Sequence, residues 1–522
     1  MIYNVENNIG ERITDMKNIL RILSFVMALS TVICFASACT QDGGDEEKPE
    51  TKTTFTVTDE YIITRPDGVS NVGLAKDLKQ SIRDITGLSL DVREDWVRDP
   101  SQIPAKEILV GKCDREESEA VYEKLGENEW TVLAAGEKIV IAGTTIRALS
   151  DAVNYFIETY VEGKSVIEMS MDASYTSGSE TKLVYFTWDE GELYEAGING
   201  GYPRLYALKD GTMLLGYDGM FVSRSTDNGL TWKGKSYASE GYVGTANAAF
   251  FQTDDGTVYL GFRSTGYNPD GSFFANIQVS YSTDNGVSWK HHSTVYENTE
   301  PTGVYKGVWE PHFGMMNGYL TCFYANDSTN VTTYQNIEYK QWDPDKKEWI
   351  NRTIVCNGEE HQSRDGMPVW QQLSTGEYVC VVEAFNKDDN NCFAVKLTWS
   401  EDGVNWSTPV TVMRAKKSGT VCAAPFIVEL PTGQLVISCQ TNENTKTKEI
   451  YTMGTVISDG TPVKYISEDC FSAHDYPYYA TAEFASTMWN GMYVYNGYIF
   501  TCSISSNLGI RICRYKFEDQ LK

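Results

Sequence analysis

The chain has 522 residues and a formal net charge of −27, with 44 lysines and arginines against 71 aspartates and glutamates. This length permits two or more domains with sizeable cores. The negative charge excludes nucleic acid as a partner, because binding to phosphates requires a basic footprint that this sequence lacks.

The first 39 residues have the pattern of a secretion signal with a lipid attachment site. From Met16, a basic start is followed by an apolar stretch and a run of small residues that ends at Cys39. This order predicts a signal peptide and not a membrane-spanning helix, with Met16 as the true start. Residues 36–39 (ASAC) resemble a bacterial lipobox, so we expect Cys39 to be the lipidated first residue of the mature protein. A cleaved signal peptide without a lipid is the alternative.

Residues 40–52 are acidic and contain no apolar side chain. Such a composition cannot bury a core and predicts a flexible tether. We therefore expect a protein that a lipid anchors in the bacterial cell envelope, on the outer surface or in the periplasm.

Residues 53–175 predict a separate α/β domain. A strand at 54–65, a helix at 71–87 and a buried strand at 107–111 come first. A helix, a hairpin and a closing helix are then expected at 117–126, 130–143 and 146–161. The segments EILVG, KIVIAG and AVNYF resemble the small non-catalytic domain that precedes the catalytic domain in bacterial hexosaminidases and α-glucuronidases. This resemblance implies a packing module without a ligand.

A short motif repeats in the second part of the chain. Residues 225–232 (STDNGLTW) and 282–289 (STDNGVSW) fit one pattern, and a shortened version covers 400–406 (SEDGVNW). With a degraded fourth copy, the terminal tryptophans fall at positions 232, 289, 349 and 406. Such regular spacing indicates an array of one supersecondary unit. The Asp and Gly suit a tight turn and the Trp suits packing between units, so the motif predicts a folding device.

Six dipeptides that end in glycine lie inside strand-like runs and predict one β-hairpin each. They are Asp210-Gly211, Asp255-Gly256, Asn317-Gly318, Thr375-Gly376, Thr432-Gly433 and Asn496-Gly497. Over residues 182–522 this gives roughly 57 residues per unit, which is enough for four short strands. The predicted fold is a six-bladed β-propeller, preceded by the α/β domain.

Cysteine and histidine spacing predicts neither a disulfide framework nor a metal site. Ten cysteines follow Cys39, and most lie in apolar strand runs, as buried small side chains do. The five histidines do not have the spacing of metal ligands. We expect no metal and no other cofactor.

The rim of the propeller channel is where catalytic side chains are expected. In each blade the inner strand begins, and the second strand ends, at the same face. Glu310 and Glu383 lie at such positions in adjacent blades, each within an apolar run that would raise the pKa of a carboxyl group. Hydrolysis of a glycosidic bond needs one protonated and one ionised carboxyl group, so these glutamates are the predicted catalytic pair. Structural pairing of each glutamate with an arginine is the alternative.

Further rim residues are predicted to bind the substrate. Arginines there would hold sugar hydroxyls or a carboxylate. The predicted substrate-binding residues are Arg204, Asp218, Arg263, Trp309, Arg364 and Asp365.

The propeller resembles the sialidase superfamily, whose members carry such Asp-box repeats. Within it, the motifs YPRLYALKDGTML, GVWEPHF followed by LTCFYAND, and RDGMPVWQQLSTGEYVCVVEAF are similar to those of the exo-arabinanase family over roughly residues 200–440. This resemblance implies a retaining exo-glycosidase that acts on an arabinose-containing or related glycan. It carries the catalytic pair over to Glu310 as nucleophile and Glu383 as acid/base, an order that the sequence does not fix. We then expect their carboxyl groups to be about 5–5.5 Å apart.

Two alternatives remain open. The first is an exo-α-sialidase, a family that uses three arginines, an aspartate acid/base and a tyrosine nucleophile. Arg204 resembles the first of those arginines, but the acidic loop expected after it is missing, and only Tyr478 and Tyr479 are candidate nucleophiles. The second alternative is a surface glycan-binding lipoprotein without catalysis. The sequence predicts neither the sugar nor the oligomeric state.

Overall fold

The computed structural model describes residues 53–178, 182–298, 306–328, 333–386, 392–443, 445, 449–473, 475, 487–505 and 508–521. The predicted signal, the lipidation site at Cys39 and the tether lie outside these residues. Within the described part, no helix is both long enough and apolar enough to cross a membrane.

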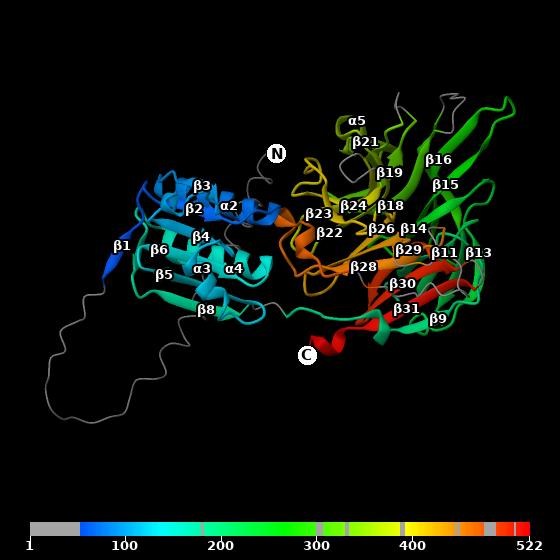
Figure 1. The fold of residues 1–522 in the computed structure, drawn as a ribbon. Coiled ribbons are helices and arrows are strands. Elements are labelled where there is room, and N and C mark those ends of the chain that lie inside the picture. Colours follow the sequence, from blue (N-terminus) through cyan, green and yellow to red (C-terminus); the bar gives the residue numbers. More distant parts are fainter. Residues whose placement is uncertain are drawn as a thin grey trace, which may run out of the picture. The chain divides into compact units, whose positions relative to one another are not determined.

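The N-terminal region is an α/β domain built on a six-stranded sheet of order β3-β2-β4-β6-β5-β8 (Figure 1). Strands β2, β3, β4 and β6 are parallel, and β5 is antiparallel to both β6 and β8. The sheet strands are β2 (Ile62–Arg65), β3 (Asp91–Glu94), β4 (Glu107–Val110), β5 (Glu129–Ala135), β6 (Lys138–Gly143) and β8 (Ser174–Gly178). A separate pair joins β1 (Thr54–Thr56) to β7 (Glu168–Ser170).

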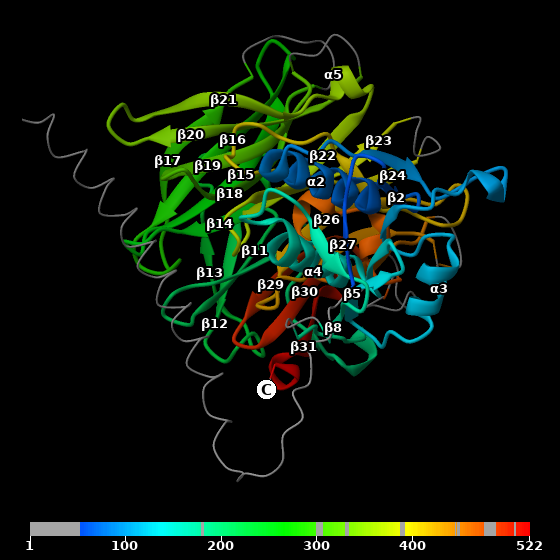
Figure 2. The same ribbon diagram turned by 90° about the vertical axis from the view of Figure 1, so that its left-hand side faces the viewer.

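Three helices cover this sheet. They are α2 (Val69–Thr86), α3 (Glu116–Tyr122) and α4 (Ile146–Phe156), the last continued by a π-helical turn at Ile157–Val161. Helices α2 and α4 lie side by side on one face (Figure 2), because their apolar side chains pack with Ile63, Ile108 and Ile141. Helix α3 packs on the other face, against the side chains of Leu109 and Val140. Successive strand residues point to opposite faces, so these buried strands are apolar throughout and have helices on both sides.

The element types predicted from the sequence of this domain are confirmed, with one change. The expected strand at 54–65 is divided into β1 and β2 by a turn at Asp59–Glu60. The sequence pattern missed β3, β7 and β8, which are short and largely exposed and therefore carry little apolar periodicity.

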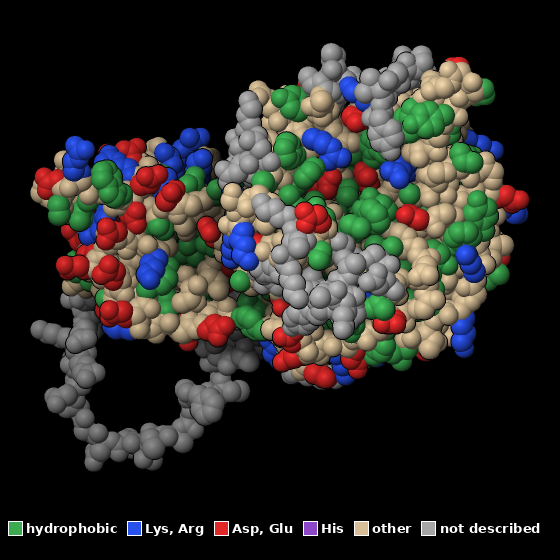
Figure 3. Space-filling model, turned by 45° about the vertical axis from the view of Figure 1, so that its right-hand side comes forward, with side chains coloured by type: hydrophobic (Ala, Val, Ile, Leu, Met, Phe, Trp, Pro, Cys, Tyr) green, Lys and Arg blue, Asp and Glu red, His purple; other side chains and the backbone are tan. Residues whose placement is uncertain are grey.

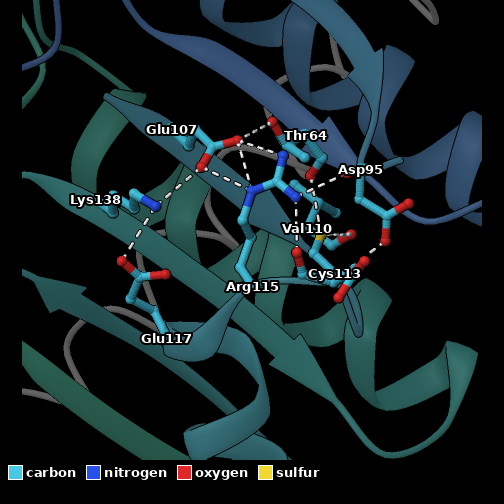
Figure 4. A network of polar contacts seen from close by, with 9 residues as sticks. Thr64, Asp95, Glu107, Val110, Cys113, Arg115, Glu117 and Lys138 are labelled. Atoms are coloured by element: carbon cyan, nitrogen blue, oxygen red, sulfur yellow. Dashed lines mark hydrogen bonds and ion pairs between the residues drawn. The ribbon is translucent and has the colours of Figure 1, made fainter. Parts of the chain in front are cut away.

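A buried ionic network joins three elements of the sheet and the start of α3 (Figure 4). The Glu107 carboxylate is fully buried and accepts hydrogen bonds from Arg115 Nε and Nη2 at 3.0–3.1 Å and from Thr64 Oγ1 at 2.8 Å. Lys138 Nζ lies 3.1 Å from the same carboxylate. Arg115 Nη1 donates to the carbonyl oxygen of Asp95. Each charged side chain of the network is paired with another protein group, so the network serves a structural role.

Six small antiparallel sheets follow, as the six blades of a β-propeller. Blade 1 contains β10 (Arg204–Ala207), β11 (Met213–Tyr217), β12 (Phe221–Ser225) and β13 (Lys233–Tyr237). Blade 2 contains β14 (Ala246–Gln252), β15 (Val258–Tyr267), β16 (Phe273–Ser282) and β17 (Lys290–Tyr296). Blade 3 contains β18 (Val308–Met316), β19 (Tyr319–Asn326), β20 (Asn336–Asp343) and β21 (Glu348–Cys356).

The remaining three blades complete the circle. Blade 4 contains β22 (Arg364–Gln372), β23 (Tyr378–Phe385), β24 (Phe393–Ser400) and β25 (Val410–Met413), preceded by the single turn α5 (Gly358–His361). Blade 5 contains β26 (Cys422–Glu429), β27 (Leu435–Thr441) and β28 (Thr452–Ile457). Blade 6 contains β29 (Thr487–Tyr495), β30 (Tyr498–Ser505), β31 (Gly509–Lys516) and a strand from elsewhere in the chain.

That last strand, β9 (Glu192–Glu195), precedes blade 1 in the sequence and closes the ring beside β31 (Figure 1). Arg514 Nε donates to Glu192 Oε2 at 2.6 Å across this seam. The two ends of the propeller are thus held in one sheet, which closes the ring of blades. The sequence pattern missed this strand, because its four residues are mostly exposed.

The repeated motifs have the structural role that their sequence predicts. All six predicted hairpins join the first two strands of a blade, and the Asp boxes lie between third and fourth strands. In the first box, Asp227 accepts hydrogen bonds from Ser225 and Thr231 inside the turn. Trp289 Nε1 donates to Ser236 Oγ of the preceding blade at 3.0 Å. The motif therefore closes turns and joins neighbouring blades.

Cysteines behave as small apolar residues here. Nine of the ten free cysteines in the described residues are buried, and the tenth, Cys392, is partly buried.

Candidate active site

Each blade has one non-glycine residue with a left-handed backbone near the start of its inner strand. In five blades, the register of the inner hairpin shifts at this residue, and in blade 1 the residue lies just before β10. The six residues, with φ between 47° and 64°, are Tyr202, Asn247, Glu310, Met367, Ala424 and Trp489. Each stands eight or nine residues before its hairpin glycine, so they occupy equivalent positions in the six blades.

This ring of left-handed residues stores backbone strain. A non-glycine residue in this conformation costs about 1–3 kcal/mol, and such residues gather at functional sites. Proline follows the left-handed residue in four of the six blades, at positions 203, 311, 368 and 425. Three of the six, Asn247, Glu310 and Met367, line one small cavity of about 20 Å³. The bulges therefore aim residues of neighbouring blades at a common point.

Glu310 occupies this position in β18 of blade 3. Burial, together with the negative charge of Glu383, raises the pKa of its carboxyl group to about 7. Arg263, Arg364 and the backbone N–H of Met367 oppose this rise without cancelling it. A carboxyl group with such a pKa keeps its proton near neutral pH and can serve as a proton donor.

Glu383 lies in β23 of blade 4, paired with Gly366 of β22, and is 7% exposed. Its Oε1 accepts a hydrogen bond from Arg364 Nη1 at 2.9 Å, and its Oε2 accepts one from the backbone N–H of Ala424 at 2.9 Å. Both oxygens are thus bound to N–H donors, one of them cationic, and these two hydrogen bonds fix the orientation of the carboxyl group. The site contains two interacting carboxyl groups in different environments.

Arg263 lies near Glu310, whose pKa its charge lowers, and Asp218 lies near Arg263 in turn. The guanidinium of Arg263 is 5.4 Å from the centre of the Trp309 ring. Burial raises the pKa of Asp218, while the backbone N–H of Asn247 and the charges of Arg263 and Arg204 oppose the rise. Figure 3 shows the surface of the propeller, on which acidic, basic and hydrophobic side chains lie next to one another.

Arg204 lies deeper in the channel. It borders both the small cavity and a cavity of about 480 Å³ along the channel axis. Its Nη1 donates to the carbonyl oxygens of Pro203, Trp489 and Asn490 at 2.8–3.1 Å. This arginine therefore ties blade 1 to blade 6, and backbone carbonyl groups already occupy that nitrogen.

Two other residues that the sequence predicted for substrate binding are buried and hydrogen-bonded to neighbouring side chains. Asp365 is buried and accepts a hydrogen bond from Ser363 Oγ at 2.6 Å, and burial raises its pKa to about 6. Trp309 is also buried, and its Nε1 donates to Asp327 Oδ1 at 3.1 Å. The contact of Trp309 with the site is through its ring, which packs against the guanidinium of Arg263.

Sequence reasoning missed four residues of this region. The rings of Tyr202 and Trp489 stack at 4.5 Å between blades 1 and 6. Asn247 borders the small cavity, and Gln335 Oε1 lies near the Cα of Gly366 beside Glu383. Tyr202, Asn247 and Trp489 could have been found from their distance to the hairpin glycines. Tyr478 and Tyr479 lie outside the described residues.

Comparison with known proteins shows that the fold of this chain is similar to that of several solved structures. No protein-family model matches the chain, and no curated protein does. Among solved structures, a mutant α-L-arabinofuranosidase of Fusarium graminearum bound to an iminosugar inhibitor has a TM-score of 0.50 and 17% identity, covering 63% of this chain and 99% of that one. An α-L-arabinanase of Penicillium chrysogenum complexed with arabinobiose has a TM-score of 0.47 and 19% identity, with coverages of 65% and 99%.

A sialidase of Streptococcus pneumoniae also matches, with a TM-score of 0.43 and 11% identity over 68% of this chain and 76% of that one. At these identities the comparison concerns the fold alone. The six blades and the similarity of fold to the Fusarium graminearum α-L-arabinofuranosidase confirm the predicted architecture. The chain carries a six-bladed β-propeller behind a small α/β domain.

Proposed function

We propose that this protein is an exo-acting glycoside hydrolase whose catalytic groups are Glu310 and Glu383. The observation that supports this most strongly is their unequal environment within one site. Glu310 has a pKa raised to about 7 by burial, whereas Glu383 is bound by Arg364 and a backbone N–H. Glycosidases need such a pair, one carboxyl group protonated and the other ionised.

The proposed reaction has two steps and retains the configuration of the sugar. In the first, the Glu383 carboxylate attacks the anomeric carbon, the bond to the leaving oxygen breaks, and Glu310 gives its proton to that oxygen. In the second, Glu310 takes a proton from water, the water oxygen attacks the anomeric carbon, and the bond to Glu383 breaks. These roles reverse the assignment that the family resemblance favours, because the protonated carboxyl group is Glu310.

The proposed substrate is a glycan with arabinose or a related neutral sugar at its non-reducing end. The order of the motifs around Arg204, Glu310 and Glu383 supports this choice, and so does the fold shared with an α-L-arabinofuranosidase. A sialic acid carboxylate needs a free arginine cluster. Here Arg364 is paired with Glu383, and Arg204 Nη1 is bound to backbone carbonyl oxygens, which disfavours a sialidase.

A panel of nitrophenyl glycosides and arabino-oligosaccharides, with one sialoside included, tests this function. We expect release of single arabinose units from the non-reducing end. Chromatography of the products measures this release. Release of sialic acid alone would establish the sialidase alternative. Release from no substrate, with binding to a glycan retained, would establish the surface glycan-binding protein.

We also propose that the protein is anchored in the cell envelope through a lipid on Cys39, on the basis of the ASAC segment and the acidic residues behind it. Cys39→Ser is expected to move the protein from the membrane fraction to the soluble fraction, measured by immunoblot of fractionated cells. An unchanged distribution would contradict lipid anchoring.

A further inference from the structure

Asn247 is a buried amide without a hydrogen-bond partner at the centre of the proposed active site. It is 3% exposed, and neither its Oδ1 nor its Nδ2 makes a hydrogen bond of good geometry with the described residues, the Tyr202 phenol being a neighbour at the margin of hydrogen-bonding range. Its backbone is left-handed, with φ at 64°, in the position that Glu310 holds in the next blade. Side chains of buried polar residues are almost always hydrogen-bonded, so an unpaired amide in this position calls for a partner that the chain does not supply.

Two neighbours of Asn247 also present unpaired polar atoms. Asp218 Oδ1 and Arg263 Nε are buried and lack a hydrogen-bond partner in the described part of the chain. Asp218 lies beside the backbone N–H of Asn247, and the Tyr202 phenol lies beside its amide. An acceptor, an amide and a donor therefore come together from blades 1 and 2, near Glu310 of blade 3.

This set of groups matches a hydroxyl group better than it matches an anion. A hydroxyl group both donates and accepts, so it can satisfy a carboxylate oxygen, an amide and a guanidinium N–H together. A carboxylate ligand only accepts, and Asp218 would repel it when ionised. The cavity that Asn247 and Glu310 line is about 20 Å³, which is room for one oxygen-sized group.

We propose that Asn247, together with Asp218 and Arg263, binds one hydroxyl group of the sugar whose glycosidic bond is cleaved, and so selects a neutral sugar with that hydroxyl free. This inference rests on the proposed glycosidase function and adds the specificity-determining residue.

Asn247→Gly tests the inference, since glycine accepts the left-handed backbone and removes only the amide. The matched control is Asn228→Gly in the first Asp box, because Asn228 has φ at 58° and an unpaired buried Oδ1 away from the site. We expect kcat/KM on the best neutral glycoside of the panel to fall about 100-fold in Asn247→Gly and to stay within about twofold of wild type in Asn228→Gly. Thermal unfolding of both variants checks that they fold.

Glycosides that each lack one hydroxyl then identify the contact. Wild type should lose about 100-fold on one of these deoxy substrates, and Asn247→Gly should cleave that same substrate as fast as wild type does. Equal losses of Asn247→Gly on every deoxy substrate, or full activity on the complete one, would overturn the inference.

Failure of the arabinose assignment is distinguishable from failure of this inference. If wild type cleaves a different neutral glycoside, the same comparison is made with deoxy forms of that sugar. If wild type cleaves nothing, calorimetry with arabinobiose compares wild type with Asn247→Gly. Binding that weakens only in Asn247→Gly supports the role of the amide, and the absence of binding to wild type contradicts it.

Discussion

Glu383→Gln is expected to abolish hydrolysis of every glycoside that the wild-type protein cleaves. Glutamine keeps the shape of the side chain and can still accept a hydrogen bond from Arg364, but it cannot form the covalent bond to the sugar. Loss of the nucleophile lowers kcat by something on the order of 10⁵-fold in comparable hydrolases. Steady-state kinetics on the best substrate of the panel measures this loss, which should be equally severe for good and poor leaving groups.

The matched control is Glu338→Gln. Glu338 is also fully buried and is paired with Arg352 at 2.7 Å, but it lies in β20, the third strand of its blade. This control should lower the thermal stability and leave kcat/KM near the wild-type value, because only the ion pair changes. Residual turnover of Glu383→Gln within tenfold of wild type would remove Glu383 from the mechanism.

Glu310→Gln is expected to change the response to pH and to leaving group. The wild-type group has a pKa raised to about 7, so its proton is present below that pH and is lost as the pH rises through it. Activity of wild type should therefore decline above about pH 7, and this decline should be absent in the variant. General acid catalysis contributes about 10²–10⁴-fold, so poor leaving groups should suffer a loss of that size.

On a nitrophenyl glycoside, Glu310→Gln should lose less of the rate of the first step, because nitrophenolate leaves without a proton. Added azide should restore turnover of Glu310→Ala and give a glycosyl azide of retained configuration, detected by NMR. An alkaline decline that persists in Glu310→Gln would show that another group donates the proton.

The propeller was predictable because its signals repeat. Six hairpin glycines and the Asp-box tryptophans recur with almost constant spacing, and one irregular blade does not hide the period. Strand β9 could not be found in this way, because its pairing with β31 joins distant segments and four mostly exposed residues carry no pattern. Closure of the ring is a property of the tertiary structure.

The positions of the two glutamates that we propose as the catalytic pair were predictable for a similar reason. Glu310 and Glu383 are carboxyl groups in apolar runs at repeated rim positions, so sequence spacing alone leads to them. Asp365 points away from Arg364 because successive strand residues face opposite sides, and β22 already begins at Arg364, in regular register with β23, a strand start that the sequence pattern did not predict. The division of roles between the glutamates was not predictable either, because it depends on Arg364 and on the N–H group of Ala424 from the next blade.

Covalent trapping is the most direct test of the proposed mechanism. The purified protein is incubated with an activated fluoro-sugar derivative of its best substrate, which slows breakdown of the glycosyl-enzyme intermediate, and its peptides are then analysed by mass spectrometry. We predict one added sugar per protein molecule, attached to the peptide that contains Glu383. A sugar attached to any residue other than Glu383, including Glu310, or inversion at the anomeric carbon in NMR of the first product, would contradict the account.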